Sequence, residues 1–289
     1  MKARRSRLYN DVEFLTELRP YRNYRNVDSL NKVCDYVRLE FAAAGFDVQD
    51  QTWKIDGIEY TNVIGTYNKG KQKRLIVGAH YDVCGDQPGA DDNASAVAGL
   101  LETARLLGES RPELDYQIDL VAFCLEEPPF FASHQMGSYV HAKSLHDQNA
   151  DLIGMICFEM IGYFSDEPNS QSFPDPALAE IYPHTANFII VVGISEFHDF
   201  NERVKSLMSE KSEVDVQSIS FPSENGLAGL SDQRNYWKFG YPALMINDTS
   251  FIRNPNYHLK SDTIETLDFE KMTEVVTGAY HAIVNFGEV

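Results

Sequence analysis

Residues 78–98 read GAHYDVCGDQPGADDNASAVA, and the order of residue types in them is the basis of the predicted fold. An apolar run at residues 75–77 leads directly into His80, and a turn rich in glycine and proline follows. The turn ends at Asp91 and Asp92, which stand in front of a run of alanine, serine and valine. This order predicts a buried strand, a turn and a helix, with a histidine and two carboxylates where the strand gives way to the helix.

Similar apolar segments recur along the chain and alternate with helical patterns. Short, nearly continuous apolar strands that alternate with helices are typical of a sheet covered on both faces. The sequence therefore predicts a single α/β domain over residues 1–289, a three-layer αβα sandwich around a central mixed, mostly parallel sheet. The expected strands contain TNVIGTY, RLIVGAH, QIDLVAFCL, IGMICFEMI, ANFIIVVGI and ALMINDT, and the expected helices cover about 28–45, 93–108, 133–146, 199–212, 231–239 and 268–285.

Charge and hydropathy exclude two classes of partner. The chain carries 43 acidic and 25 basic residues, a net charge of −18, whereas nucleic-acid binding requires a basic surface. No apolar run approaches the roughly 20 residues that a membrane-spanning helix needs, so no membrane partner is expected. The N-terminus, MKARRSRLYNDVEF, lacks the apolar segment of a signal peptide. A cytoplasmic location is therefore expected, with a secreted or periplasmic one left open.

The four cysteines show no metal-binding spacing such as CxxC. Cys124 and Cys157 lie in apolar strands, where cysteine behaves as a small buried hydrophobe. Cys84 lies four residues after His80, so a ligand role comes into consideration. A single cysteine without a partner is more often structural, and the sequence therefore predicts no ligand role for it.

Three of the expected strands end in residue types that bind metals. His80 ends one strand, Glu126 and Glu127 end another, and Glu159 lies late in a third. Ligands of open α/β sheets bind outside the carboxyl ends of the strands, so these side chains converge if the strands are neighbours. Buried carboxylates are costly without a counter-charge. A divalent cation such as Zn²⁺ supplies that charge and binds both imidazole nitrogen and carboxylate oxygen.

The acids near these strand ends fall into different roles. Asp82 lies two residues after His80, on the same face of a strand, where it can accept the imidazole N–H and fix the tautomer. Of the Asp91–Asp92 pair, one carboxylate can bridge two metal ions while the other caps the following helix. Of the Glu126–Glu127 pair, one can bind an ion and the other can hold the attacking water as general base. Helix capping and a solvated turn remain the alternatives for these pairs.

Five motifs in this order, GAHYD, PGADDNASAVAGLLE, FCLEE, FEMIG and NYHLKSDT, resemble the M28 family of zinc peptidases, which contains dinuclear aminopeptidases and glutaminyl cyclases. The likeness runs from about residue 28 to the C-terminus and implies two Zn²⁺ ions per chain. It implies Asp91 as the bridging carboxylate, Glu126 as general base, Tyr257 as a group that polarises the substrate carbonyl, and Asp82 as the residue that orients His80. Asp92 is assigned to helix capping. The other implied metal ligands are His80, Glu127, Glu159 and His258.

Two positions depart from the family pattern. The aspartate usual in the FEMIG motif is Glu159 here, whose side chain is one methylene longer, so its geometry stays open. Gln233 stands where relatives often carry the histidine of a Ser-Asp-His run, which puts a substrate contact from that position in doubt.

The main hypothesis is therefore a dinuclear zinc-dependent aminopeptidase. This hydrolase would remove N-terminal residues from peptides that carry a free N-terminus, through a metal-bridging hydroxide with Glu126 as general base. The alternative is a glutaminyl cyclase-like acyltransferase with a single zinc, held by Asp91, Glu127 and His258. Ser231 stands where cyclases carry an acid, and Tyr257 where they carry a tryptophan, so the peptidase is favoured. A non-catalytic binding domain is a third hypothesis, disfavoured because every implied position holds a competent residue.

Two irregular segments could shape the site. Residues 164–185 are polar and rich in proline, and residues 221–231 are rich in glycine, serine and proline. Long irregular loops in a compact domain are often walls or lids of functional sites, and a disordered excursion is the alternative. The sequence predicts neither the preferred substrate side chain nor the oligomeric state.

Overall fold

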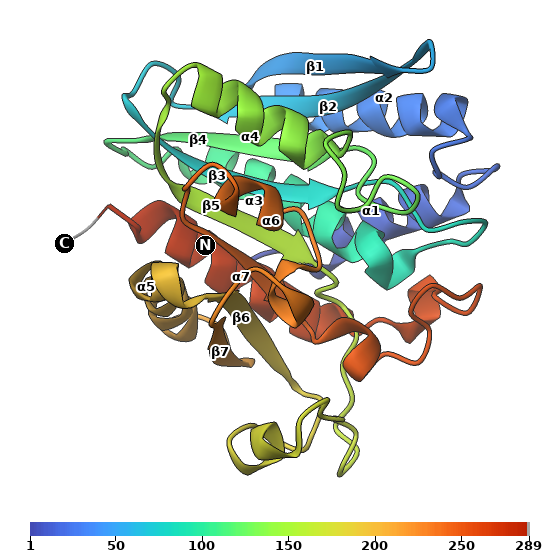
Figure 1. Cartoon of the computed structure of the whole chain (residues 1–289), viewed down its shortest axis with the longest axis vertical. Coiled ribbons are helices and arrows are strands. Elements are labelled where there is room, and N and C mark those ends of the chain that lie inside the picture. The colour runs from blue at the N-terminus through green and yellow to red at the C-terminus, as the bar shows by residue number, and fades with distance from the viewer. Residues whose placement is uncertain (288–289) are drawn as a thin grey trace.

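Eight strands form one mixed sheet in the computed structural model, which describes residues 1–287 (Figure 1). The order across the sheet is β1-β2-β4-β3-β5-β8-β6-β7. The pairs β4–β3, β3–β5, β5–β8 and β6–β7 are parallel, and β1–β2, β2–β4 and β6–β8 are antiparallel. The strands are β1 (Asp47–Ile55), β2 (Ile58–Tyr67), β3 (Lys73–His80), β4 (Gln117–Phe123), β5 (Asp151–Glu159), β6 (Phe188–Ile194), β7 (Asp215–Phe221) and β8 (Ala243–Asn247).

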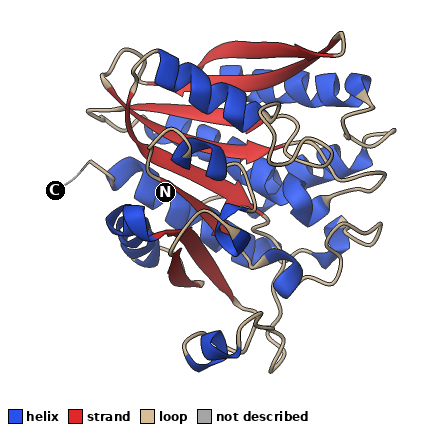
Figure 2. Cartoon of the chain, viewed as in Figure 1, coloured by secondary structure: helices blue, strands red, loops and turns tan. Residues whose placement is uncertain are grey.

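Helices cover both faces of this sheet (Figure 2). The apolar side chains of α1, α2, α3, α5 and α7 join one core cluster, and those of α4 and α6 join a second cluster on the opposite face. This arrangement confirms the predicted α/β sandwich with a mixed, mostly parallel sheet. The helices are α1 (Arg5–Glu17), α2 (Val27–Ala43), α3 (Ala96–Ser110), α4 (Gly137–Asp147), α5 (His198–Ser209), α6 (Arg234–Trp237) and α7 (Phe269–Asn285).

The apolar strands of the sequence become the middle of the sheet because both of their faces are covered. Every residue of β4 and β6 is buried. Side chains alternate along β3: Leu75 and Val77 join the core under α3, and Ile76 joins the core under α4. Such strands need apolar residues at successive positions, which explains their nearly continuous hydrophobicity.

The connection from β3 to α3 differs from the expected simple helix start. An irregular helical segment, η1 (Ala90–Ser95), precedes α3, and Asp92 within it has φ −101° and ψ 90°, outside the helical range. Gly89 enters this segment at φ 61°, and a Cβ there would lie 2.3 Å from the Asp92 carbonyl oxygen. The fully buried Arg22 guanidinium donates to the carbonyls of Tyr81 (2.8 Å) and Gly89 (2.6 Å). The turn is thus anchored by a glycine and by a buried cation.

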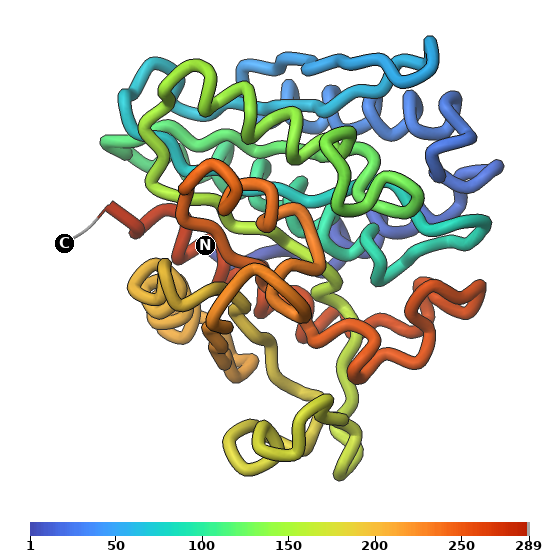
Figure 3. Tube along the Cα trace, in the orientation of Figure 1, coloured from blue at the N-terminus to red at the C-terminus, as the bar shows by residue number. Residues whose placement is uncertain are grey.

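Several other boundaries differ slightly from expectation. The helix expected at 231–239 is reduced to the four residues of α6, and the helix expected at 133–146 begins at Gly137. Residues 164–185 extend away from the body of the molecule, as the yellow-green tube in Figure 3 shows, and contain the short helix η2 (Pro176–Glu180). Among the described residues, no helix has the length and apolar character to cross a membrane.

Candidate metal centre

The predicted metal-binding residues meet at one edge of the sheet. His80 is the last residue of β3, Glu159 is the last of β5, and Glu126 and Glu127 follow β4. These three strands are neighbours in the order β4-β3-β5, and all three run parallel. Their carboxyl ends therefore deliver the four side chains to one place, as expected for an open α/β sheet.

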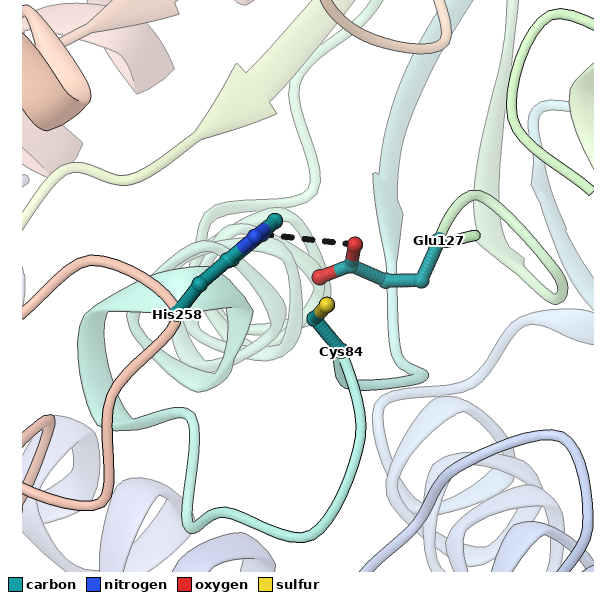
Figure 4. Close-up of side chains that lie close together, drawn as sticks. All are labelled: Cys84, Glu127 and His258. Carbon is teal, nitrogen blue, oxygen red and sulfur yellow. Dashed lines mark ion pairs between the residues drawn. The ribbon is translucent and has the colours of Figure 1, made fainter. Parts of the chain in front are cut away.

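Two imidazoles flank one carboxylate at the centre of this cluster. His80 Nε2 lies 3.2 Å from Glu159 Oε2 and 3.5 Å from Asp92 Oδ1. His258 Nε2 lies 3.0 Å from Asp92 Oδ2 and 3.4 Å from Glu127 Oε2 (Figure 4). Asp92 thus presents one oxygen to each histidine. Glu159 and Glu127 occupy the two ends.

The two adjacent aspartates lie differently from the expectation, and neither caps the helix with its side chain. Asp91 points away from the imidazoles: its Oδ1 accepts the Gly162 N–H (3.0 Å) and its Oδ2 accepts from Asn254 Nδ2 (2.7 Å). Asp92, expected to cap the helix, occupies the bridging place instead. The non-helical backbone at Asp92 turns its side chain away from that of its neighbour. The expectation for Asp91 is therefore corrected: Asp92, and not Asp91, is the aspartate that lies between the two imidazoles.

A third aspartate holds this pair in place. Asp262 accepts the backbone N–H groups of Asp91 (2.9 Å) and Asp92 (3.1 Å) with its two carboxylate oxygens. The first backbone N–H groups of η1 are thus capped by a side chain that follows His258 in the sequence. Burial and, to a lesser extent, the nearby Asp91 raise the pKa of Asp262 to about 8.

Asp82 lies between His80 and the turn that follows β4. Its backbone carbonyl oxygen lies 3.2 Å from His80 Nδ1 and its carboxylate Oδ1 lies 3.6 Å away, so the carboxylate is not the nearer partner. The two carboxylate oxygens accept the backbone N–H groups of Glu126 and Glu127, each at 3.1 Å. Asp82 therefore fixes the turn that carries both glutamates.

The longer side chain of Glu159 still reaches the cluster. Its Oε2 accepts hydrogen bonds from Ser231 Oγ (2.6 Å) and from Asn93 Nδ2 (3.2 Å), besides lying near His80. Gln233, the other departure from the family pattern, is buried and donates to the Ala228 carbonyl (2.7 Å). It has no place in the cluster.

Negative charge exceeds positive charge among these buried groups. Burial alone would lower the pKa of His80, but Glu159 and Glu126 outweigh it and raise that pKa well above its usual range. Burial likewise lowers the pKa of His258, and hydrogen bonds to Asp92 and Glu127 outweigh it and raise the value to about 10. Burial and then Asp92 raise the pKa of Glu127 to about 8. Bound cations would stabilise this excess of buried carboxylates.

The donor set fits two divalent ions. His80, Asp92 and Glu159 offer ligand atoms that all lie within 4.8 Å of one another. Cys84, Glu127 and His258 form a second such group, and His258 Nε2 of this group lies 3.0 Å from Asp92 Oδ2. Imidazole nitrogen with carboxylate oxygen is a ligand set of Zn²⁺. One buried oxygen, Glu127 Oε1, also lacks a hydrogen-bond partner among the described residues.

An apolar cavity opens beside this centre. Glu159 and Tyr257 stand at its polar end, and its wall is mostly hydrophobic. The segment 164–185 contributes Phe173 and Leu178, and the segment 221–231 contributes Leu227 and Leu230. Both irregular loops are therefore walls of the site region. Tyr257 stacks on His258, with ring centroids 3.8 Å apart.

Sequence reasoning missed the residues that support the ligands. Asp262 and Asn254 are distant in sequence from the aspartates that they contact, and only Asp262 stands in a motif, NYHLKSDT, that pointed to the site. Ser231 was singled out only as a difference from cyclases, and its bond to Glu159 had no signal in the sequence.

The sheet and its buried centre define an α/β protein with a candidate metal site at the carboxyl ends of parallel strands. Residues 62–283 match the model of Peptidase family M28, and the chain belongs to this family. It is 41% identical over 286 residues to the uncharacterized protein YfbL of Escherichia coli K12, covering 96% of this chain and 87% of that protein. It is 25% identical over 282 residues to a probable leucine aminopeptidase of Trichophyton verrucosum, covering 92% of this chain and 69% of that protein.

Two solved structures show the same fold. One is a glutaminyl cyclase of Bacteroides thetaiotaomicron, with a TM-score of 0.75, 20% identity, and coverage of 99% of both chains. The other is a leucine aminopeptidase precursor from the same species, with a TM-score of 0.73 and 20% identity, covering 99% of this chain and 98% of that one. At this identity the likeness concerns the fold alone.

Proposed function

We propose that this chain is a dinuclear zinc-dependent aminopeptidase that releases apolar N-terminal residues from peptides. The observation that carries the proposal is the position of Asp92, which presents one oxygen to each of two imidazoles. A single-ion site would need no carboxylate shared in this way. The names of the aminopeptidases among its relatives and structural neighbours support the same activity.

The chain's own residues would hold the ions at two positions that share Asp92. His80 and Glu159 complete one position, and Glu127 and His258 complete the other. Bound ions would polarise the scissile carbonyl and lower the pKa of a nearby water.

Glu126 is placed to move the proton. It is 5% exposed, and its Oε2 lies 3.8 Å from His80 Nε2 at the edge of the cluster. Burial, reinforced by Glu127 and Glu159 and opposed by His80, raises the pKa of Glu126 well above its usual range. A carboxylate with a raised pKa accepts a proton from water and returns it to the leaving amine. Asp82 holds the Glu126 backbone in place for this transfer.

Tyr257 supplies a hydrogen-bond donor on the side of the cavity. Burial raises the pKa of its phenol far above the ordinary value, and Asp92 and Glu127 raise it further. The hydroxyl therefore stays protonated and is able to donate to the oxyanion that forms from the substrate carbonyl. Its stacking on His258 fixes the ring beside the centre.

Charge and cavity shape together indicate the substrate. The excess of carboxylates in the centre favours the free α-ammonium group of a peptide, which explains exopeptidase action. The first side chain would enter the neighbouring cavity, whose wall includes Phe173, Ile190, Val192, Phe221 and Met245. Such a wall favours an apolar residue such as leucine or phenylalanine over a charged one.

A peptide panel tests this function. The zinc-loaded protein is incubated with peptides that begin with Leu, Phe, Lys or Gln and with an N-acetylated Leu peptide. We expect release of Leu and Phe, slower release of Lys, and no cleavage of the acetylated peptide. Loss of ammonia from the Gln peptide without release of free residues would instead indicate a cyclase. A cyclase is not favoured, because Ser231, which donates to Glu159, is neutral where cyclases carry an acid.

A substitution at Glu126 separates catalysis from binding. Glu126→Gln should lower kcat by roughly 10²–10⁴-fold, the usual contribution of a general base, with unchanged zinc content. Glu196→Gln, an exposed glutamate away from the centre, is the matched control and should leave kcat unchanged. The proposal is wrong if no peptide is hydrolysed, or if Glu126→Gln keeps full activity.

A further inference from the structure

Cys84 lies beside one half of the metal centre. Its Sγ, a carboxylate oxygen of Glu127 and a ring nitrogen of His258 all lie within 4.8 Å of one another. Figure 4 shows the Cys84 side chain reaching from the loop after β3 toward the Glu127 carboxylate, which the His258 ring also faces. The sulfur is thus in the position of a further donor to any ion held by Glu127 and His258.

A second, independent observation points to a ligand at this place. Glu127 is 4% exposed, and only its Oε2 faces His258. Its Oε1 is buried without a hydrogen-bond partner among the described residues. A buried carboxylate oxygen in this condition is costly unless a cation or a donor meets it. Cys84 is the third member of the group of ligand atoms to which the Glu127 carboxylate belongs.

The other three cysteines have an ordinary structural explanation, and Cys84 does not. Cys34, Cys124 and Cys157 are fully buried in the apolar core, and Cys34 Sγ lies 3.1 Å from the Tyr81 hydroxyl. Cys84 is only partly buried and stands in a loop, outside both core clusters. Packing therefore accounts for three of the cysteines and leaves the fourth at the ligand cluster.

We propose that the Cys84 sulfur binds the ion at the Asp92–Glu127–His258 position, which makes this position selective for thiophilic ions such as Zn²⁺. The opposite position, with His80, Glu159 and Asp92, offers nitrogen and oxygen only. Thiolate ligands select Zn²⁺, whereas carboxylate and water suit Mn²⁺ and Mg²⁺. The two positions are therefore chemically unequal. This inference rests on the metal centre of the proposed function and is independent of the peptide that is cleaved.

Zinc X-ray absorption on the full-length protein tests the proposal directly. Zinc–sulfur distances are about 2.3 Å, and zinc–nitrogen and zinc–oxygen distances are about 2.0–2.2 Å. A single sulfur ligand on one of the two zinc ions is therefore detectable in the averaged spectrum. We expect a sulfur contribution in the wild type and its loss in Cys84→Ser. The Co²⁺-loaded wild type should show sulfur-to-cobalt charge-transfer absorption in the near ultraviolet, which Cys84→Ser lacks. Cys34→Ser, which leaves every donor in place, is the matched control and should behave as the wild type.

Metal affinity supplies a second readout. In competition with a chelator, Cys84→Ser should lower the affinity for one of the two zinc ions by roughly 10–100-fold. This is the loss in affinity that follows when a residue that only supports a metal ligand is removed, and a direct ligand should cost at least as much. Mn²⁺ binding should change little. Equal zinc affinity in the wild type and in Cys84→Ser would overturn the proposal.

Alkylation of the wild type keeps the test valid if the variant fails to fold. Iodoacetamide should modify Cys84 in the metal-free protein and be blocked from it by zinc, as located by peptide mapping. Zinc bound with nitrogen and oxygen neighbours only, and with Cys84 still reactive, would overturn this inference and leave the proposed function standing. A protein that binds no divalent metal would overturn both.

Discussion

Asp91 and Asp92 are adjacent and chemically identical, yet the structure assigns them different tasks, and substitution by asparagine distinguishes these tasks. Asp92 faces His80 at 3.5 Å with one oxygen and His258 at 3.0 Å with the other. Asp91 faces neither imidazole and accepts from Gly162 and Asn254. We expect Asp92→Asn to impair metal binding and Asp91→Asn to impair stability.

The magnitudes follow from these contacts. Loss of a residue that only supports a metal ligand costs roughly 10–100-fold in affinity, and Asp92 is placed to bind both ions directly. Asp92→Asn should therefore weaken both zincs by about 100-fold or more, which corresponds to about 2.7 kcal/mol for each ion. In Asp91→Asn, one acceptor oxygen becomes an NH₂ group that faces a donor. This buried mismatch should cost about 1–3 kcal/mol of the free energy of unfolding.

Two measurements separate the effects. Zinc content is determined after equilibrium dialysis against buffered free Zn²⁺, and the free energy of unfolding is determined in urea with a chelator present, so that metal does not contribute. Wild-type zinc content in Asp91→Asn together with depleted zinc in Asp92→Asn is the expected result. The reverse pattern, with Asp92→Asn retaining two tightly bound zincs and Asp91→Asn losing one, would refute the assignment of the bridging carboxylate.

Three further predictions concern the anchor of the turn, the pH dependence of stability and the oxyanion donor. Arg22→Met should lower the free energy of unfolding in urea by about 3 kcal/mol or more, because the buried carbonyls of Tyr81 and Gly89 lose their donor; Arg25→Met, at an exposed position, should have little effect. Burial, with a smaller effect of Arg74, lowers the pKa of His141 to about 3, and its Nδ1 lies 2.6 Å from the Tyr236 hydroxyl. The unfolded chain therefore binds the extra proton, and stability is lost as the pH falls from about 6.5 toward 3, by up to about 1.4 kcal/mol per pH unit. His141→Gln should flatten this pH dependence of the free energy of unfolding, measured by urea titrations across pH. His146→Gln, an exposed change on the same helix, is the control, and equal slopes in the two variants would contradict the prediction. Tyr257→Phe should lower kcat on a Leu peptide by on the order of 10²-fold with a smaller change in KM, and an unchanged kcat would remove Tyr257 from the oxyanion site.

The layers of the fold and the donor types of the candidate site are readable from the residue pattern alone. Continuous apolar strands such as β4 and β6 require cover on both faces, and this demand is local to each strand. His80 and Glu159 stand at strand ends, and the carboxyl ends of neighbouring parallel strands share one edge of the sheet. A histidine and several acids at that edge were therefore recognisable as a candidate metal site without coordinates.

Which of the two adjacent acids faces the imidazoles follows from long-range contacts of the folded chain. That choice depends on the non-helical backbone at Asp92, on the backbone N–H groups that donate to Asp262, and on the hydrogen bond that Asn254 donates to Asp91. The place of Cys84 beside Glu127 and the bond from Ser231 to Glu159 were decided in the same way. Residue type and spacing fix which donors are available, but the direction of a side chain follows from local dihedral angles and distant partners, which a linear pattern does not contain.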